Sequence, residues 1–204
     1  MFTLATTGLL VNQDFSLPIA ATILWLTVFD AFCAHQAMTG GMLGVGRFDY
    51  HNARWKLVDR TQLNMSEQNI LFIGLVWLHA LFVDAQLAGF LGCIASVFRY
   101  TYPLLRMLAR NTRPAADFAD GFILVELSTQ PYWFCLNTLK ANLLAQLVTG
   151  APLVHYETLG VRSLGLMTSL YVGVMLLTMV LMLPLYLAAR LKYTDQGAAK
   201  DKAP

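Results

Sequence analysis

Apolar stretches separated by short polar clusters run through most of the chain of 204 residues, and four of them are candidates to cross a membrane. The longest has no charged residue from Ser163 to Ala189. A helix needs roughly 20 apolar residues to cross the hydrocarbon core of a bilayer. The hydrophobic pattern therefore predicts membrane-spanning helices over about 15–37, 66–84, 85–106 and 163–190.

The two middle stretches are too short to cross a membrane without their polar neighbours. One must include Glu67 and Asp84, and the other must include Arg99 and Arg106. Charged groups at membrane depth normally face the interior of a helix bundle or a water-filled cavity. The short connection between the two stretches, DAQLAG (84–89), predicts an antiparallel helical hairpin.

The segment from 111 to 160 mixes apolar runs with polar residues, and Pro131 is expected to break it. We interpret it as one or two amphipathic helices that lie at the membrane interface or against a partner. Tyr132 and its aromatic neighbours are typical of an interfacial anchor. A fifth membrane crossing is the alternative. The predicted fold is an all-α, multi-pass integral membrane protein: one transmembrane domain, a four-helix bundle with an inserted amphipathic segment.

The composition supports a membrane protein and disfavours other classes. Hydrophobic residues make up 57% of the chain, charged residues 13%, and the mean hydropathy is +0.55. Soluble domains contain about 25% charged residues. A net charge of +2 does not favour a nucleic-acid partner. The four histidines and three cysteines have no metal-ligand spacing, so we expect no metal site.

Polar residues gather where the second predicted helix begins, in RTQLNMSEQNILF (60–72). Residues 60, 64 and 67 lie on one helical face, because their spacing is i, i+4 and i+7. The next helix carries a second one-face stripe with spacing i, i+3, i+7 and i+11. If the hairpin folds about residue 87, Arg106 lies at the depth of Glu67, and Arg110 lies near Asn64. The second stripe consists of Arg99, Tyr102, Arg106 and Arg110.

Two facing stripes of this kind would form an arginine-rich cleft that suits a small anion carrying an amine. Arginines bind carboxylates through paired hydrogen bonds, and Glu67 could bind an ammonium group. Glutathione has two carboxylates, an amine and two peptide bonds, so it matches this set of side chains. The same residues are also compatible with a purely structural role, as a helix start, an inter-helix salt bridge and flanking positive charges.

The motif RTQLNMSEQN resembles the second-helix signature of the MAPEG family, the membrane-associated proteins in eicosanoid and glutathione metabolism. The matching residues are Arg60, Gln62, Asn64, Ser66 and Glu67. Arg99 and Tyr100 resemble, less specifically, an arginine–tyrosine pair in the third helix of the family. The resemblance covers about 34–110, half of the chain.

The resemblance implies four-helix subunits that form homotrimers, with glutathione bound as co-substrate between adjacent subunits. The glutathione contacts would be Arg60, Asn64, Glu67 and Tyr100, with a weaker one from Gln62 and with Arg99 beside Tyr100. An arginine stabilises the glutathione thiolate in the family's enzymes, and Arg106 and Arg110 are the candidates here. The thiolate would attack an apolar electrophile that arrives from the surrounding membrane lipid, in a transferase or peroxidase-like reaction.

The chain departs from the family pattern in ways that put catalysis in question. The thiolate-stabilising arginine of the family falls near Asn111, and the second family tyrosine is replaced by Pro103 or Leu104. The segment 111–160 is also an addition to the family pattern. The alternative function is therefore a non-catalytic, MAPEG-like accessory subunit that scaffolds a larger membrane complex.

Overall fold

The structure, a computed structural model, describes residues 14–45, 51–111 and 118–200 and contains no strand within them. The prediction of an all-helical chain is confirmed for these residues. The α-helices are α1 (Ser16–Leu43), α2 (Ala53–Phe82), α3 (Ala85–Asn111), α4 (Phe118–Thr149) and α5 (Val161–Lys200), with a 3-10 turn η1 (Tyr156–Thr158) before α5.

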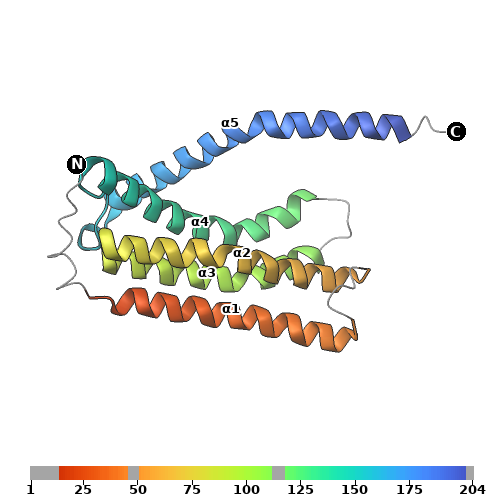
Figure 1. Cartoon of the computed structure of the whole chain (residues 1–204), viewed down its shortest axis with the longest axis horizontal. Helices are drawn as coiled ribbons and strands as arrows, with labels where there is room; N and C mark the ends of the chain where they lie inside the picture. Colours follow the sequence, from red (N-terminus) through yellow and green to blue (C-terminus); the bar gives the residue numbers. More distant parts are fainter. Residues whose placement is uncertain (1–13, 46–50, 112–117, 201–204) are drawn as a thin grey trace.

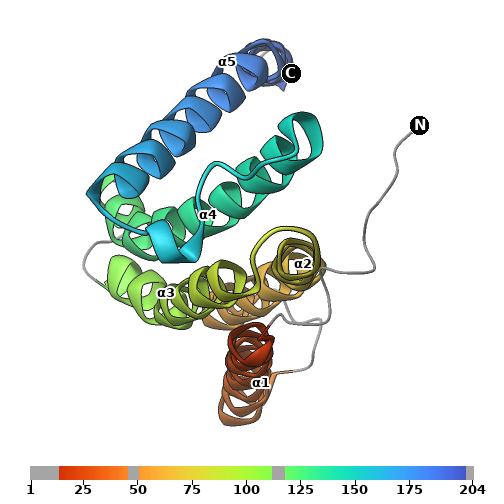
Figure 2. The same cartoon turned by 90° about the vertical axis from the view of Figure 1, so that its left-hand side faces the viewer.

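The helices are arranged in layers, with α2 and α3 in the middle, α1 on one side and α4 on the other (Figure 1). Helix α3 lies at the centre, because its two most extensive interfaces are with α4 and α1. Helix α5 packs mainly against α4, and it forms the outermost layer in the turned view (Figure 2). The bundle is therefore built from α1 to α4, with α5 at its periphery.

The helix that completes the bundle is not the one that was predicted. The segment 111–160 was predicted as an insertion, but its helix α4 contributes Tyr132, Cys135, Leu136 and Leu139 to the hydrophobic core. The predicted fourth core span lies in α5, whose one buried residue among those described is Met167. Hydropathy identified the wrong helix as the fourth core helix. It detects long apolar stretches, whereas packing in a bundle requires only an apolar face directed at the core.

Pro131 was expected to break the segment, and that prediction is wrong. The residue lies inside α4, which continues for 32 residues. Proline lacks the backbone N–H that would bond one turn back, so it weakens a helix at that point and commonly bends it. Figure 1 shows that α4 changes direction near its middle. Despite the bend, the interface between α3 and α4 is the most extensive one between two helices of the described chain.

Three helical segments in the described part of the chain are long and apolar enough to cross a membrane. They are Ser16–Leu43, Arg54–Phe82 and Val161–Pro184. Each contains most of one of the predicted stretches 15–37, 66–84 and 163–190. The predicted stretch 85–106 is not among them. Its helix α3 carries buried polar side chains, such as that of Arg99, which lower its hydropathy, and it packs against α1, α2 and α4 at the centre of the bundle.

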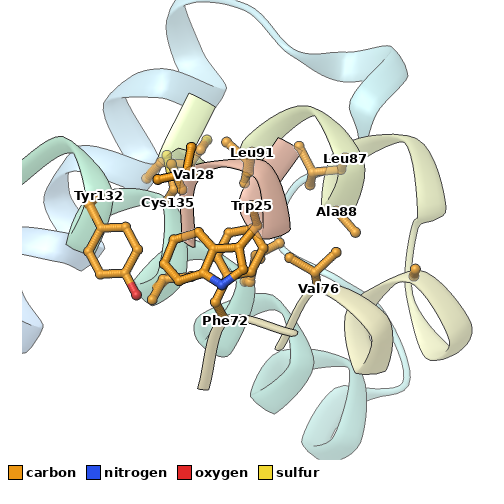
Figure 3. Close-up of a cluster of buried hydrophobic side chains, with 14 of the residues drawn as sticks. Trp25, Val28, Phe72, Val76, Leu87, Ala88, Leu91, Tyr132 and Cys135 are labelled. Atoms are coloured by element: carbon orange, nitrogen blue, oxygen red, sulfur yellow. The ribbon is translucent and has the colours of Figure 1, made fainter. Parts of the chain in front are cut away.

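The core is anchored by stacked aromatic rings from three helices (Figure 3). Trp25 of α1 lies nearly parallel to Phe72 of α2, with ring centroids 3.9 Å apart, and Tyr132 of α4 stacks on Trp25 at 5.8 Å. The Trp25 indole N–H donates to Asn69 Oδ1 at 2.8 Å, so its one polar atom is satisfied. These contacts fix the depth of α1 and α4 relative to α2.

The connection between α2 and α3 is shorter than DAQLAG, because only Val83 and Asp84 separate the two helices. The Asp84 carboxylate caps α3 by accepting the backbone N–H of Leu87 at 2.9 Å. Its second oxygen accepts the N–H of Tyr156, at the start of η1, at 2.8 Å. One side chain therefore sets the hairpin turn and holds the linker that leads to α5.

Small residues on α3 allow α1 to approach closely, and Gly89 is the tightest point. A Cβ atom placed on Gly89 would lie 2.3 Å from the Leu17 carbonyl carbon and 2.4 Å from the Pro18 nitrogen. We expect Gly89→Ala to lower the free energy of unfolding by about 1–3 kcal/mol, because backbone atoms of α1 would have to move.

Gly74→Ala is the matched control, because a Cβ there meets no atom within 4 Å. It should raise the free energy of unfolding by up to about 1 kcal/mol, since alanine is the better helix former. Equilibrium unfolding in detergent micelles measures both changes. Equal effects of the two substitutions would contradict the close contact between α1 and α3.

Candidate functional site

A cluster of polar side chains lies where α2, α3 and α4 meet. Its centre is Arg99 of α3, which is only 2% exposed. The Arg99 Nη2 donates to Asn64 Oδ1 of α2 at 2.8 Å. Two residues that the sequence placed on facing stripes are therefore in direct contact, with an amide rather than a carboxylate as the arginine's partner.

Tyr102 extends this network toward the end of the hairpin. Its hydroxyl oxygen accepts from Asn64 Nδ2 at 3.3 Å and from Arg106 Nη1 at 3.2 Å. Arg106 Nη1 also donates to the hydroxyl of Thr61 at 3.1 Å. The Asn64 amide uses both its oxygen and its nitrogen within the cluster, so this side chain is already bound within the chain.

The Arg99 guanidinium is enclosed by two aromatic rings. Its central carbon lies 4.6 Å from the Tyr102 ring centroid and 5.2 Å from that of Tyr132, which belongs to α4. Cation–π contacts of this kind stabilise a desolvated guanidinium by about 2 kcal/mol. The Tyr132 hydroxyl donates to Gln68 Oε1 at 3.2 Å, so α4 is tied to α2 across the arginine. Helix α4 therefore covers one side of Arg99 through the ring of Tyr132.

Two features of the cluster are unfavourable within the described part of the chain: an unpaired N–H donor and positive charge without a counter-charge. The Arg99 Nε is buried and has no hydrogen-bond partner. Arg99 and Arg106 both contact Tyr102, yet neither forms an ion pair with a described carboxylate. Buried charge without a counter-charge is costly, so the aromatic faces and neutral acceptors carry the stabilisation.

The register of the hairpin differs by about two helical turns from the predicted one. Folding about residue 87 placed Asn64 near Arg110, whereas the structure brings Asn64 to Arg99. Thr61, rather than Glu67, contacts Arg106. The physical reason is the turn itself: α3 begins at Ala85, so the hairpin folds about 83–84.

Arg60 and Glu67 lie on the outside of α2 rather than inside a cleft. Arg60 Nη1 is 3.9 Å from Glu67 Oε1, and the two side chains are 58% and 52% exposed. An exposed pair of this kind contributes at most about 1 kcal/mol. The two predicted ligand contacts are thus close to each other and accessible, and they are not among the hydrogen-bond and ring partners of Arg99.

Of the remaining predicted site residues, Gln62 and Tyr100 lie outside the cluster. The Gln62 Nε2 donates to Ser66 Oγ of the same helix at 3.1 Å and to Cys33 Sγ of α1 at 3.4 Å. Tyr100 is 56% exposed and follows Arg99 by one position, which turns it to another face of α3. The backbone of Arg110 lies in α3, but its side chain falls outside the described residues.

Sequence reasoning missed Thr61 and Tyr132 as members of the cluster. Tyr102 was on the predicted stripe, and its spacing of i+3 from Arg99 was the signal for its role. Tyr132 carried no such signal, because its contact with Arg99 joins positions far apart in the sequence. Its interpretation as an interfacial anchor is wrong, since the side chain is fully buried.

No group of three or more histidine, cysteine, aspartate or glutamate residues within the described part of the chain could hold a metal ion. Comparisons of the chain with family models, curated proteins and solved structures find no match. The resemblance of RTQLNMSEQN to the MAPEG signature, and the glutathione contacts that it implies, stay predictions from the sequence.

The Arg99–Asn64 contact generates a stability prediction. Asn64→Ala should lower the free energy of unfolding by about 2 kcal/mol, because a hydrogen bond to a buried charged group is lost. Tyr100→Ala is the control on the neighbouring helix and should change the free energy by less than about 0.5 kcal/mol, since the side chain is exposed. Unfolding in detergent micelles measures both, and equal losses would argue against a central role for Arg99.

Proposed function

We propose that this chain is a multi-pass integral membrane protein that acts as a non-catalytic subunit and scaffolds a larger membrane assembly. The observation that carries the proposal is the enclosure of Arg99. The residues that would have to bind a ligand in the predicted cleft, Asn64 and Arg99, bind each other, and the ring of Tyr132 of α4 covers Arg99.

The distribution of apolar surface also supports the proposal. Three described helices are long and apolar enough to cross a membrane. Helix α5 is apolar along Val161–Pro184, yet only 6% of its most apolar 18-residue stretch is buried within the chain. Lipid or other subunits would have to cover this surface in a membrane. A bundle with a closed polar interior and apolar outer helices suits a structural subunit better than an enzyme that must admit two substrates.

A second candidate function, glutathione-dependent conjugation or reduction of an apolar electrophile, is favoured by one observation. Arg60 and Glu67 are accessible and 3.9 Å apart, so they present a cation and an anion at one place. Glutathione carries both charges and could bind there in a homotrimer if a neighbouring subunit completed the site. Arg106, which is partly exposed, is the described candidate for stabilising the thiolate.

Calorimetric titration of glutathione into the detergent-purified protein separates the two functions. The scaffold proposal predicts no saturable binding by the folded wild-type chain. Binding that Arg60→Ala and Glu67→Ala abolish, while Arg54→Ala leaves it unchanged, would support the second candidate. Arg54 is a suitable control because it is an exposed arginine on the same helix.

The mass of the native assembly provides the complementary prediction. Light scattering of material extracted from its own membrane in mild detergent should give a protein mass well above that of a homotrimer of the 22.7 kDa chain. Mass spectrometry should identify other polypeptides in constant ratio to it. A particle made of this chain alone would contradict the scaffold proposal.

A further inference from the structure

A second buried polar network lies at the opposite end of the bundle, at the end of α2. Its centre is the contact between His79 of α2 and Asn142 of α4, whose Nε2 and Nδ2 atoms are 3.2 Å apart. Both side chains are almost completely buried. Asn142 also bonds to the linker between α4 and α5, so this contact joins three parts of the chain.

The backbone of the linker fixes the orientation of the Asn142 amide. Its Oδ1 accepts the N–H groups of Leu153 and Val154, each at 3.0 Å. Its Nδ2 donates to the Val154 carbonyl oxygen at 2.8 Å. A flipped amide would set its NH₂ group against two N–H donors, so the group that faces His79 is a donor.

This orientation determines the protonation state of His79. Because Asn142 donates, His79 Nε2 must accept and therefore carries no proton. The proton of the neutral ring lies on Nδ1, which donates to the Asp84 carbonyl oxygen at 3.0 Å. The geometry requires a neutral His79 with its proton on Nδ1.

We propose that the His79–Asn142 contact is a proton-sensitive latch that holds the α4–α5 linker, and through it the start of α5, against the bundle. Protonation of His79 would place an N–H on Nε2 directly against the NH₂ group of Asn142. Two donors cannot share a hydrogen bond, so Asn142 must turn or move away. Its three bonds to Leu153 and Val154 would then be lost together.

The linker is the main constraint on α5 at this end. Helix α5 packs mainly against α4, and its contacts among the described side chains lie in its first half, where Tyr171 meets Gln130 and Phe134. Helix α5 begins at Val161, seven positions after Val154, with the 3-10 turn η1 between them. Opening of the latch would therefore change the angle at which α5 leaves the bundle rather than unfold α1 to α4.

Two other titratable groups act on His79 and must be separated from it. Asp84 lies in the α2–α3 connection, and His155 lies in the linker with its Nδ1 3.6 Å from Asp84 Oδ2. Protonation of His155 would strengthen its pairing with Asp84 and thus favour the closed linker, whereas protonation of Asp84 would weaken both that pairing and the bond to the Tyr156 N–H. Only protonation of His79 acts through Asn142.

Hydrogen exchange of the linker, measured across a pH series in detergent micelles, tests the latch. The protection factors of the Leu153 and Val154 amides should fall about tenfold or more in acid, because the bonds to Asn142 are lost. Amides in the middle of α3 should keep their protection, which excludes global unfolding as the cause. His155→Gln should retain the acid-induced loss, because His155 does not contact Asn142.

His79→Gln is the decisive variant, since glutamine offers Asn142 an uncharged acceptor at every pH. In this variant the acid-induced loss at Leu153 and Val154 should disappear. Loss of the same size in His79→Gln and in the wild type would overturn the proposal, and so would the absence of any loss in the wild type.

A measurement on the unaltered protein covers the case in which His79→Gln fails to fold. Nitrogen NMR of the labelled protein at neutral pH reports which nitrogen of His79 carries the proton. The latch requires a neutral ring with its proton on Nδ1, converting to the doubly protonated form as the linker amides lose protection. A proton on Nε2 at neutral pH would overturn the proposal.

Discussion

The burial of one guanidinium group, that of Arg99, constrains how α2, α3 and α4 can be arranged. A charged group with 2% exposure must find its partners inside the protein. Asn64 supplies a hydrogen-bond acceptor from α2, Tyr102 a ring from α3 itself, and Tyr132 a ring from α4. If any of the three helices were shifted by a turn, the arginine would lose part of this shell. The register of the hairpin and the position of α4 both follow from this requirement.

The sequence predicted those parts of the fold that depend on local patterns. Hydrophobic length identified α1, α5 and most of α2, and the i, i+4 and i, i+3 spacings put Asn64 and Arg99 on facing stripes. It could not predict the turn residue that sets the register, because DAQLAG reads equally well as a loop or as a capped helix start. Asp84 decides this through a single hydrogen bond to the Leu87 N–H.

The role of α4 could not be predicted from the sequence, for a different reason. Its polar residues and Pro131 lower its hydropathy, so the segment looked like an insertion. In the bundle, those polar residues supply partners to other buried polar groups. Asn142 satisfies the linker backbone, and Tyr132 covers Arg99 while its hydroxyl bonds to Gln68. A helix that supplies partners for buried polar groups cannot be recognised from its own sequence, because the partners lie far away in the chain.

The two polar networks lie on either side of an apolar middle, and this spacing matches a membrane. Asn64 and His79 are 15 positions apart in α2, which corresponds to about 22 Å at 1.5 Å per residue. The stacked rings of Trp25 and Phe72 lie between them. The hydrocarbon core of a bilayer is about 30 Å thick, so each network would lie toward one boundary of it, where polar groups are tolerated better than at the centre. Specific polar contacts at both ends would then set the register of the bundle, while the middle is held together by apolar packing.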